Sequence, residues 1–315
     1  AQNFFDDELK ITLGGRLDGI RIANEEALSY DYLIMNGTRN DSPPSQRITF
    51  EENEELKVSW SANLGLLYAL TNTMDLSFSA GRSFRAPSLE ESFKYIDLGN
   101  LVRLGDPGLD PEKGYTTNVG LRIWKPKFQF QLDGFINWLS DMIVEKPGEF
   151  VYSYTTGVLD TIPALINTNV DQARLYGFDF NFQYNFYKDM VLHGAGSYVR
   201  GEDTKSNTDL PLIPPMNGRL GIKYTLPGLF GLDLVTIGYA DQDKVADGEM
   251  QTKGYARFDL ALNSKLIILD YAKIQFFGGI ENIGDRAYTN HLATNRGSIS
   301  IEPGRNFYIK MKVLF

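Results

Sequence analysis

The sequence feature that most constrains the fold is an alternation of apolar and polar side chains. It is clearest over residues 178–186, where every second residue is aromatic: Phe178, Phe180, Phe182, Tyr184 and Phe186. The residues between them are polar, and residues 307–315 largely repeat the pattern. Successive side chains of a β-strand point to opposite faces, so both segments predict strands with one apolar and one polar face. Such strands suit a wall with lipid on one side and a wet or polar interior on the other.

The alternation predicts about twelve strands, joined by connections of two sizes. Short turns are expected near residues 71, 125, 187, 227 and 265, and long loops near residues 25–55, 85–113, 146–171, 201, 241 and 284. Short turns at one end of a sheet and long loops at the other are typical of outer-membrane barrels. The predicted fold class is therefore all-β, an antiparallel transmembrane β-barrel, with residues 1–315 as one barrel portion.

Soluble β-sandwiches and propellers also contain many strands. Their strands usually have five or six residues, whereas several of those predicted here have about nine to eleven, which favours the membrane barrel. The periodicity leaves open whether the twelve strands close on themselves or belong to a larger wall. The segment Asn3 to Lys10 resembles the end of one strand and a turn into the next, which indicates a chain cut inside a larger barrel.

Composition narrows the class of protein further. No apolar run is long enough for a transmembrane helix. The formal charge of -9 argues against nucleic-acid binding, which needs a basic surface. The chain has no Cys, so no thiol catalyst, disulfide or thiolate metal site is expected. The 20 Phe and 17 Tyr agree with a barrel that carries aromatic girdles.

Two motifs lie in the second long loop. Residues 81–91 read GRSFRAPSLEE, and residues 105–112 read GDPGLDPE. Three shorter motifs lie elsewhere: LGGRLD at 13–18, LYGFD at 175–179 and IENIGDRAY at 280–288. Taken in chain order, the five motifs resemble the landmarks of TonB-dependent outer-membrane receptors, in which an F-R-A-P-S-type box leads the chain out of the wall. The residues of that box here are Arg82, Phe84, Arg85, Ala86 and Pro87.

The resemblance implies a bacterial outer-membrane protein, surrounded by lipid, that is one part of a roughly 22-stranded barrel. Family members also have an N-terminal plug domain that contacts TonB, and no plug is recognisable here. The chain therefore resembles the C-terminal portion of a receptor whose N-terminal strands and plug are missing. The terminal Phe315 resembles the signal read by the barrel-assembly machinery.

The function that the resemblance implies is TonB-energised uptake of a ferric siderophore or a similar bulky nutrient; cobalamin and haem are alternative ligands. A self-contained pore and an outer-membrane enzyme are alternative functions. No catalytic residue, metal site or cofactor is predicted. His193 has no evident Ser nucleophile beside it, and the acidic residues 241–249 do not have EF-hand spacing.

Tyr and Arg side chains suit an anionic, aromatic ligand such as an iron chelate. On this basis the candidate ligand-binding residues are Arg85, Tyr95, Arg103, Tyr288, His291 and Arg296. A purely structural role is the alternative for the F-R-A-P box, with Phe84 in an aromatic girdle, Arg85 at the headgroups and Pro87 ending the strand. His291 is a candidate haem ligand, although residues 88–104 contain no His, unlike haem receptors of the family.

Overall fold

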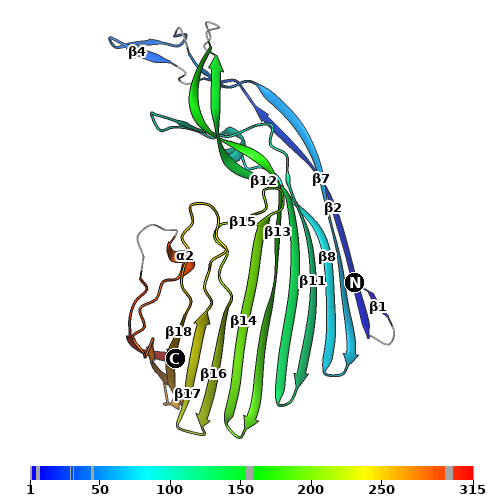
Figure 1. The fold of residues 1–315 in the computed structure, drawn as a ribbon, viewed down its shortest axis with the longest axis vertical. Helices are drawn as coiled ribbons and strands as arrows, with labels where there is room; N and C mark the ends of the chain where they lie inside the picture. The colour runs from blue at the N-terminus through cyan, green and yellow to red at the C-terminus, as the bar shows by residue number, and fades with distance from the viewer. Residues whose placement is uncertain are drawn as a thin grey trace.

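The chain forms one large, curved and almost entirely antiparallel β-sheet (Figure 1). The structure is a computed structural model that describes residues 2–4, 8–28, 30, 32–43, 46–153, 159–294 and 301–314. The candidates Arg296 and Phe315 lie outside the described residues. Neither helix in the described part of the chain has the length and apolar character needed to span a bilayer.

Within the described residues, twelve strands of nine residues or more form the wall, in agreement with the predicted number of about twelve. In chain order they are β2 (Leu9–Asn24), β7 (Asn53–Thr71), β8 (Met74–Arg85), β11 (Glu112–Lys125), β12 (Phe128–Ser153), β13 (Leu159–Tyr187), β14 (Met190–Asp203), β16 (Asn217–Leu226), β17 (Phe230–Tyr239), β18 (Tyr255–Ser264), β20 (Lys273–Glu281) and β21 (Asn306–Leu314). Each pairs antiparallel with the next. This up-and-down order is that of a barrel wall.

The wall is open within the described residues. β1 (Gln2–Phe4) pairs only with Leu9–Ile11 of β2, and β21 pairs only with β20. No pairing joins β21 to β1 or β2 in the part of the chain that the structure describes. Both edges of the sheet therefore carry backbone groups that need further partners.

The predicted loop at residues 146–171 is wrong in part, because two strands extend into it. β12 and β13 remain paired to their tip, where Ser153 lies opposite Leu159, so residues 146–153 and 159–171 are strand rather than loop. This extension lacks clear alternation, and it contains Pro147 and Pro163, which normally argue against a strand. Figure 1 shows the extension rising above the rest of the wall.

The remaining elements are short and lie mostly in the long loops. Residues 25–52, predicted as loop, contain β3 (Ala27–Leu28), β4 (Leu33–Met35), β5 (Thr38–Asn40) and β6 (Ile48–Phe50). The other short elements are α1 (Leu89–Phe93), β9 (Tyr95–Asp97), β10 (Val102–Leu104), β15 (Thr208–Asp209), β19 (Ile267–Ile268) and α2 (His291–Thr294).

The register sorts the side chains into two faces. Phe180 lies opposite Leu132 and Gly196, whereas the next residue, Asn181, lies opposite Gln131 and Ala195. The apolar face is exposed in this chain, as Leu13, Leu17, Val58, Trp60, Ile309 and Met311 show. The buried apolar residues instead gather at the loop end: Val102, Leu104, Leu109, Ala164 and Ala173. A large exposed apolar face on a sheet without an apolar core in its wall is the inverse of a soluble domain and fits a lipid-facing surface.

Glycines on both faces of the wall accept aromatic rings from the neighbouring strand. A Cβ atom at Gly196 would lie 2.5 Å from the ring of Phe180. The same relation places Gly279 under Tyr308 on the opposite face. At these positions a glycine leaves room for the aromatic ring of the paired residue.

We predict that Gly196→Val destabilises the wall by about 1–3 kcal/mol, because the ring of Phe180 must leave its position. Gly238→Val is the matched control, since its Cβ would meet nothing closer than a backbone oxygen at 4.0 Å. The thermal unfolding midpoint in detergent measures both. Equal shifts for the two variants would contradict the role given to Gly196.

Candidate functional site

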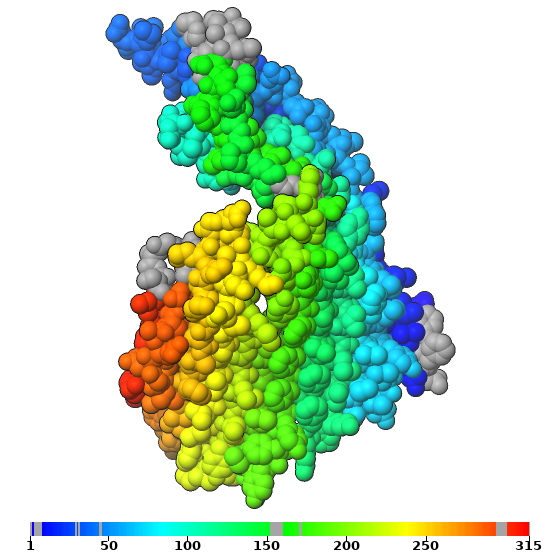
Figure 2. Space-filling view, viewed as in Figure 1, coloured from blue at the N-terminus to red at the C-terminus, as the bar shows by residue number. Residues whose placement is uncertain are grey.

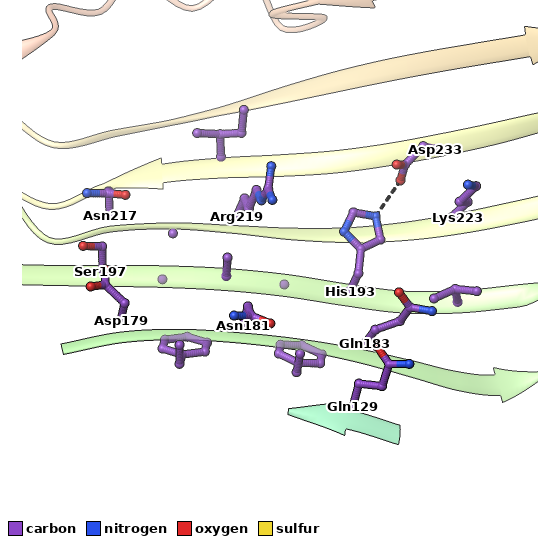
Figure 3. A pocket seen from close by; sticks show the side chains of 18 of the residues that line it. Gln129, Asp179, Asn181, Gln183, His193, Ser197, Asn217, Arg219, Lys223 and Asp233 are labelled. Carbon is purple, nitrogen blue, oxygen red and sulfur yellow. Dashed lines mark hydrogen bonds and ion pairs between the residues drawn. The ribbon is translucent and has the colours of Figure 1, made fainter. Parts of the chain in front are cut away.

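The polar face of the wall carries a groove of about 970 Å³. Figure 3 shows side chains from β12, β13, β14, β16 and β17 pointing into it. Its labelled polar lining consists of Gln129, Asp179, Asn181, Gln183, His193, Ser197, Asn217, Arg219, Lys223 and Asp233. Charges of both signs alternate with amides, so the groove suits water, a polar solute or a polar protein surface.

Hydrogen bonds between strands order this face. His193 Nε2 and Asp233 Oδ1 are 2.9 Å apart. Beside the groove, Arg122 of β11 donates to both oxygens of Asp75 on β8, at 2.9 and 2.6 Å. Asp75 is only 5% exposed. A two-point guanidinium–carboxylate pair fixes both side chains against the wall.

The groove does not contain the geometry of a serine hydrolase. Ser197, the serine in its lining, is four residues from His193 on the same strand. At a rise of about 3.3 Å per residue, the two side chains are roughly 13 Å apart, far beyond hydrogen-bond reach.

The F-R-A-P box connects the end of β8 to the second long loop through the contacts of Arg85. Arg85 donates to Glu91 at 2.7 and 2.9 Å and to Glu112 at 2.6 Å. Ser88 caps α1, and Glu91 completes a capping box by accepting from the Ser88 backbone N–H at 2.8 Å. Arg85 is thus held by two carboxylates. By register it lies on the face opposite to that of Arg82.

The pKa of Glu91 is lowered to about 2, mainly by the hydrogen bond from Arg85, although partial burial acts in the opposite direction. Three further contacts lock the loop: Asn167 donates to Glu91 O at 2.8 Å, Lys57 donates to Leu109 O, and Gly105 donates to Lys94 O at 2.7 Å.

Tyr95 and Arg103 belong to a platform above the wall, which we define as α1, β9, β10 and the extension of β12 and β13. β10 pairs in parallel with residues Ala164–Ile166 of β13. Tyr95 packs edge-on against Phe150, with ring centroids 6.4 Å apart. In Figure 2 the green and cyan atoms of this platform stand above the wall.

Glu145 of β12 binds both Arg103, at 2.6 Å, and Lys94, at 2.6 Å. These two cations, Arg103 first, hold the pKa of Glu145 below its usual range. The candidate residues Tyr95 and Arg103 therefore have structural contacts within the platform, apart from any contact with a ligand.

Tyr288 lies in an aromatic stack at the loop end of the polar face. The ring of Tyr255 is 4.9 Å from that of Tyr239 and 4.2 Å from that of Tyr288. Arg257 donates to the Tyr288 hydroxyl at 2.8 Å. Tyr239 also lines the groove, so the stack forms one end of it.

His291 is not part of this open surface. It is 2% exposed, its Nδ1 lies 3.2 Å from Thr252 Oγ1, and its Nε2 lies 3.4 Å from Glu249 Oε1. The structure therefore brings Tyr288 to the groove and keeps His291 buried nearby. Tyr95 and Arg103 lie in the loop platform, and Arg85 of β8 is bound to it through Glu91.

Sequence reasoning missed the partners that hold these candidates. One of them left a visible signal, because Ser88 and Glu91 have the spacing of a capping box before a short helix. The sequence carries no local signal for Glu112 and Glu145, because they lie 27 and 42 residues from Arg85 and Arg103, which they bind. Tyr239 and Tyr255 could be placed on strands but not against Tyr288.

A wall with an apolar outer face, a polar inner face and long loops at one end defines a transmembrane β-barrel. A family model described as TonB dependent receptor-like, beta-barrel, matches residues 1–283. The chain belongs to this TonB-dependent receptor family.

Curated relatives include Heme/hemopexin utilization protein C of Haemophilus influenzae (strain 86-028NP), 26% identical, and Vitamin B12 transporter BtuB of Vibrio vulnificus (strain YJ016), 21% identical. The alignments cover 76% and 80% of this chain but 35% and 37% of those proteins, so the chain spans little more than a third of their length.

Solved structures give the same fold. The copper transporter OprC matches with a TM-score of 0.71 and 21% identity, over 97% of this chain and 45% of that one. A ferric enterobactin receptor of Pseudomonas aeruginosa matches with a TM-score of 0.67 and 17% identity, over 95% of this chain and 46% of that one. At these identities the likeness concerns the fold alone.

We predict that Glu91→Gln loosens the platform at neutral pH, because Arg85 and the Ser88 N–H lose a charged acceptor. Protease cleavage between residues 86 and 111 is expected to accelerate about tenfold, as for the loss of a charge-assisted hydrogen bond. The control is Glu90→Gln, which changes the preceding residue of the same helix. Equal acceleration by both variants would contradict the prediction.

The lowered pKa of Glu91 also predicts a pH window. A carboxylate with a depressed pKa stabilises the folded state fully above its ordinary pKa, near 4.3, and loses that contribution as pH falls toward about 2. Cleavage by an acid-active protease should therefore be constant from pH 6 to about 5 and rise between about 4 and 2. Glu91→Gln should reduce this rise and leave the part that belongs to Glu145, whose pKa is also lowered. An unchanged profile in that variant would contradict the assignment.

Proposed function

We propose that residues 1–315 are the C-terminal portion of the barrel of a bacterial outer-membrane receptor, which takes up a ferric siderophore or a similar bulky nutrient with energy from TonB. One observation carries the proposal: in this member of the TonB-dependent receptor family, the polar inner groove ends at a cluster of aromatic rings and a guanidinium. We call this cluster, Tyr239, Tyr255, Arg257 and Tyr288, the mouth.

The open edges support a larger barrel. In lipid, an unpaired strand edge leaves backbone groups without hydrogen bonds, at a cost of several kcal/mol each. The outer edges of β2 and β21 therefore need further strands, which we assign to the N-terminal part of the receptor barrel. The barrel-assembly machinery would complete closure in the outer membrane.

The inner face supports a plug domain within that barrel. The groove between β12 and β17 exposes amides and charges of both signs, including Arg219, Lys223 and Asp233. A polar, preformed face of this kind is complementary to a hydrated protein surface. In this proposal the plug rests against the groove and carries the contact with TonB.

The mouth supports an anionic, aromatic ligand. The rings of Tyr239, Tyr255 and Tyr288 offer stacking surfaces, and the guanidinium of Arg257, which also pairs with Asp259 at 3.3 Å, lies beside them. Stacking together with a guanidinium suits the planar, negatively charged groups of an iron chelate. Haem coordination by His291 would require this buried side chain to leave Thr252 and Glu249.

The proposal is tested by uptake of radiolabelled ferric siderophores into cells that lack the gene for this chain, with complementation. Uptake is expected to need both the gene and TonB, while labelled haem and cobalamin serve as competing ligands. Uptake of haem or cobalamin in place of the chelate would reassign the ligand. A steady ion conductance without TonB-dependent uptake would overturn the proposal in favour of a pore.

In the same cells, we predict that Arg257→Gln weakens binding of the chelate about tenfold, because it removes one charge-assisted contact. The control is Lys253→Gln, which removes an exposed cation from the neighbouring loop and is expected to leave binding unchanged. Surface levels of both variants are measured with an antibody. Equal affinities at equal surface levels would place the ligand elsewhere.

A further inference from the structure

Aromatic and basic residues form a lateral row on the outer face of the wall. Cross-strand pairing places Arg82 opposite Tyr115, Tyr115 opposite Trp138, and Trp138 opposite Arg174. Arg82 shares its face with Met74, Leu76, Phe78 and Ala80 of β8, which are all apolar. The row therefore lies on the lipid side.

The row lies at the boundary of the membrane. Arg82 is the ninth residue of β8, counted from the short turn at its start. A tilted barrel strand crosses the hydrocarbon core in about 9–11 residues, so the guanidinium reaches the interface at the end that carries the long loops. Tyr115 and Trp138 are 46% and 42% exposed, as expected for an aromatic girdle at that level.

The guanidinium of Arg82 is held in place by neutral groups. It lies 4.2 Å above the ring of Trp60, its Nη1 donates to the Trp60 carbonyl oxygen, and its Nε donates to the Tyr115 hydroxyl at 3.3 Å. Arginine has five N–H donors, so these two contacts leave the others for an external acceptor.

The charge of Arg82 has no carboxylate partner among the described residues. Arg174, at the far end of the row, binds Glu202 at 2.6 Å, and Arg200 binds the same carboxylate at 2.5 Å. A cation at the headgroup level of a membrane attracts the anionic groups of lipids. We propose that Arg82, between Trp60 and Tyr115, binds a phosphate on the headgroup of an outer-leaflet lipid whose acyl chains lie along the apolar wall.

The test uses native mass spectrometry on the full-length receptor that carries this chain, purified in mild detergent and mixed with diphosphoryl lipid A or its dephosphorylated counterpart. The wild type is expected to retain the phosphorylated lipid about tenfold more than the other, the ratio given by one charge-assisted contact. Arg82→Gln should bring the ratio close to one. Arg82→Lys should give an intermediate ratio, because it keeps the charge without the planar fork.

The control is Lys312→Gln. This variant removes a cation from the polar inner face of β21, opposite to the lipid side, and should leave the ratio unchanged. Only the folded species is counted, so a loss of folding in one variant does not alter the ratio. Equal retention of both lipids by the wild type, or an unchanged ratio in Arg82→Gln, would overturn the proposal. Displacement of the lipid by inorganic phosphate alone would overturn the assignment to a lipid.

Discussion

The structure depends on one constraint, the pairing of backbone groups between neighbouring strands. In lipid no water is available for unpaired N–H and C=O groups, so each strand needs a partner along its length. The twelve long strands meet this requirement where they pair in chain order from β2 to β21, and it stays unmet along the outer edges of β2 and β21 within the described residues. Because the side chains of a strand alternate, the same pairing also decides which of them meet lipid and which meet the interior.

This alternation separates functions that are adjacent in sequence. Arg82 and Arg85 belong to one short motif but lie on opposite faces of β8. Arg85 closes the loop platform through Glu91 and Glu112, whereas Arg82 lies among aromatic rings on the lipid side. A single motif can therefore position both an outer loop and a contact with the membrane.

The wall could be predicted from sequence because its signal is local. The alternation at Phe178–Phe186 and the short turns indicated strands whose positions the structure confirms. The extension of β12 and β13 was missed because apolar and polar residues do not alternate clearly there. The contacts of Arg103 and Tyr288 were missed because their partners lie on other strands, and no local pattern encodes such distant pairs.

The account is tested most directly by measuring which side of β13 faces lipid. The chain has no Cys, so single substitutions give specific labelling sites. Spin labels at Phe180→Cys, Phe182→Cys, Asn181→Cys and Gln183→Cys in the full-length receptor, reconstituted in bilayers, report accessibility to oxygen and to a water-soluble nickel chelate. Oxygen is predicted to reach 180 and 182 more readily, and 181 and 183 should be shielded from lipid. Uniform accessibility along the strand, or the opposite alternation, would contradict the barrel wall described here.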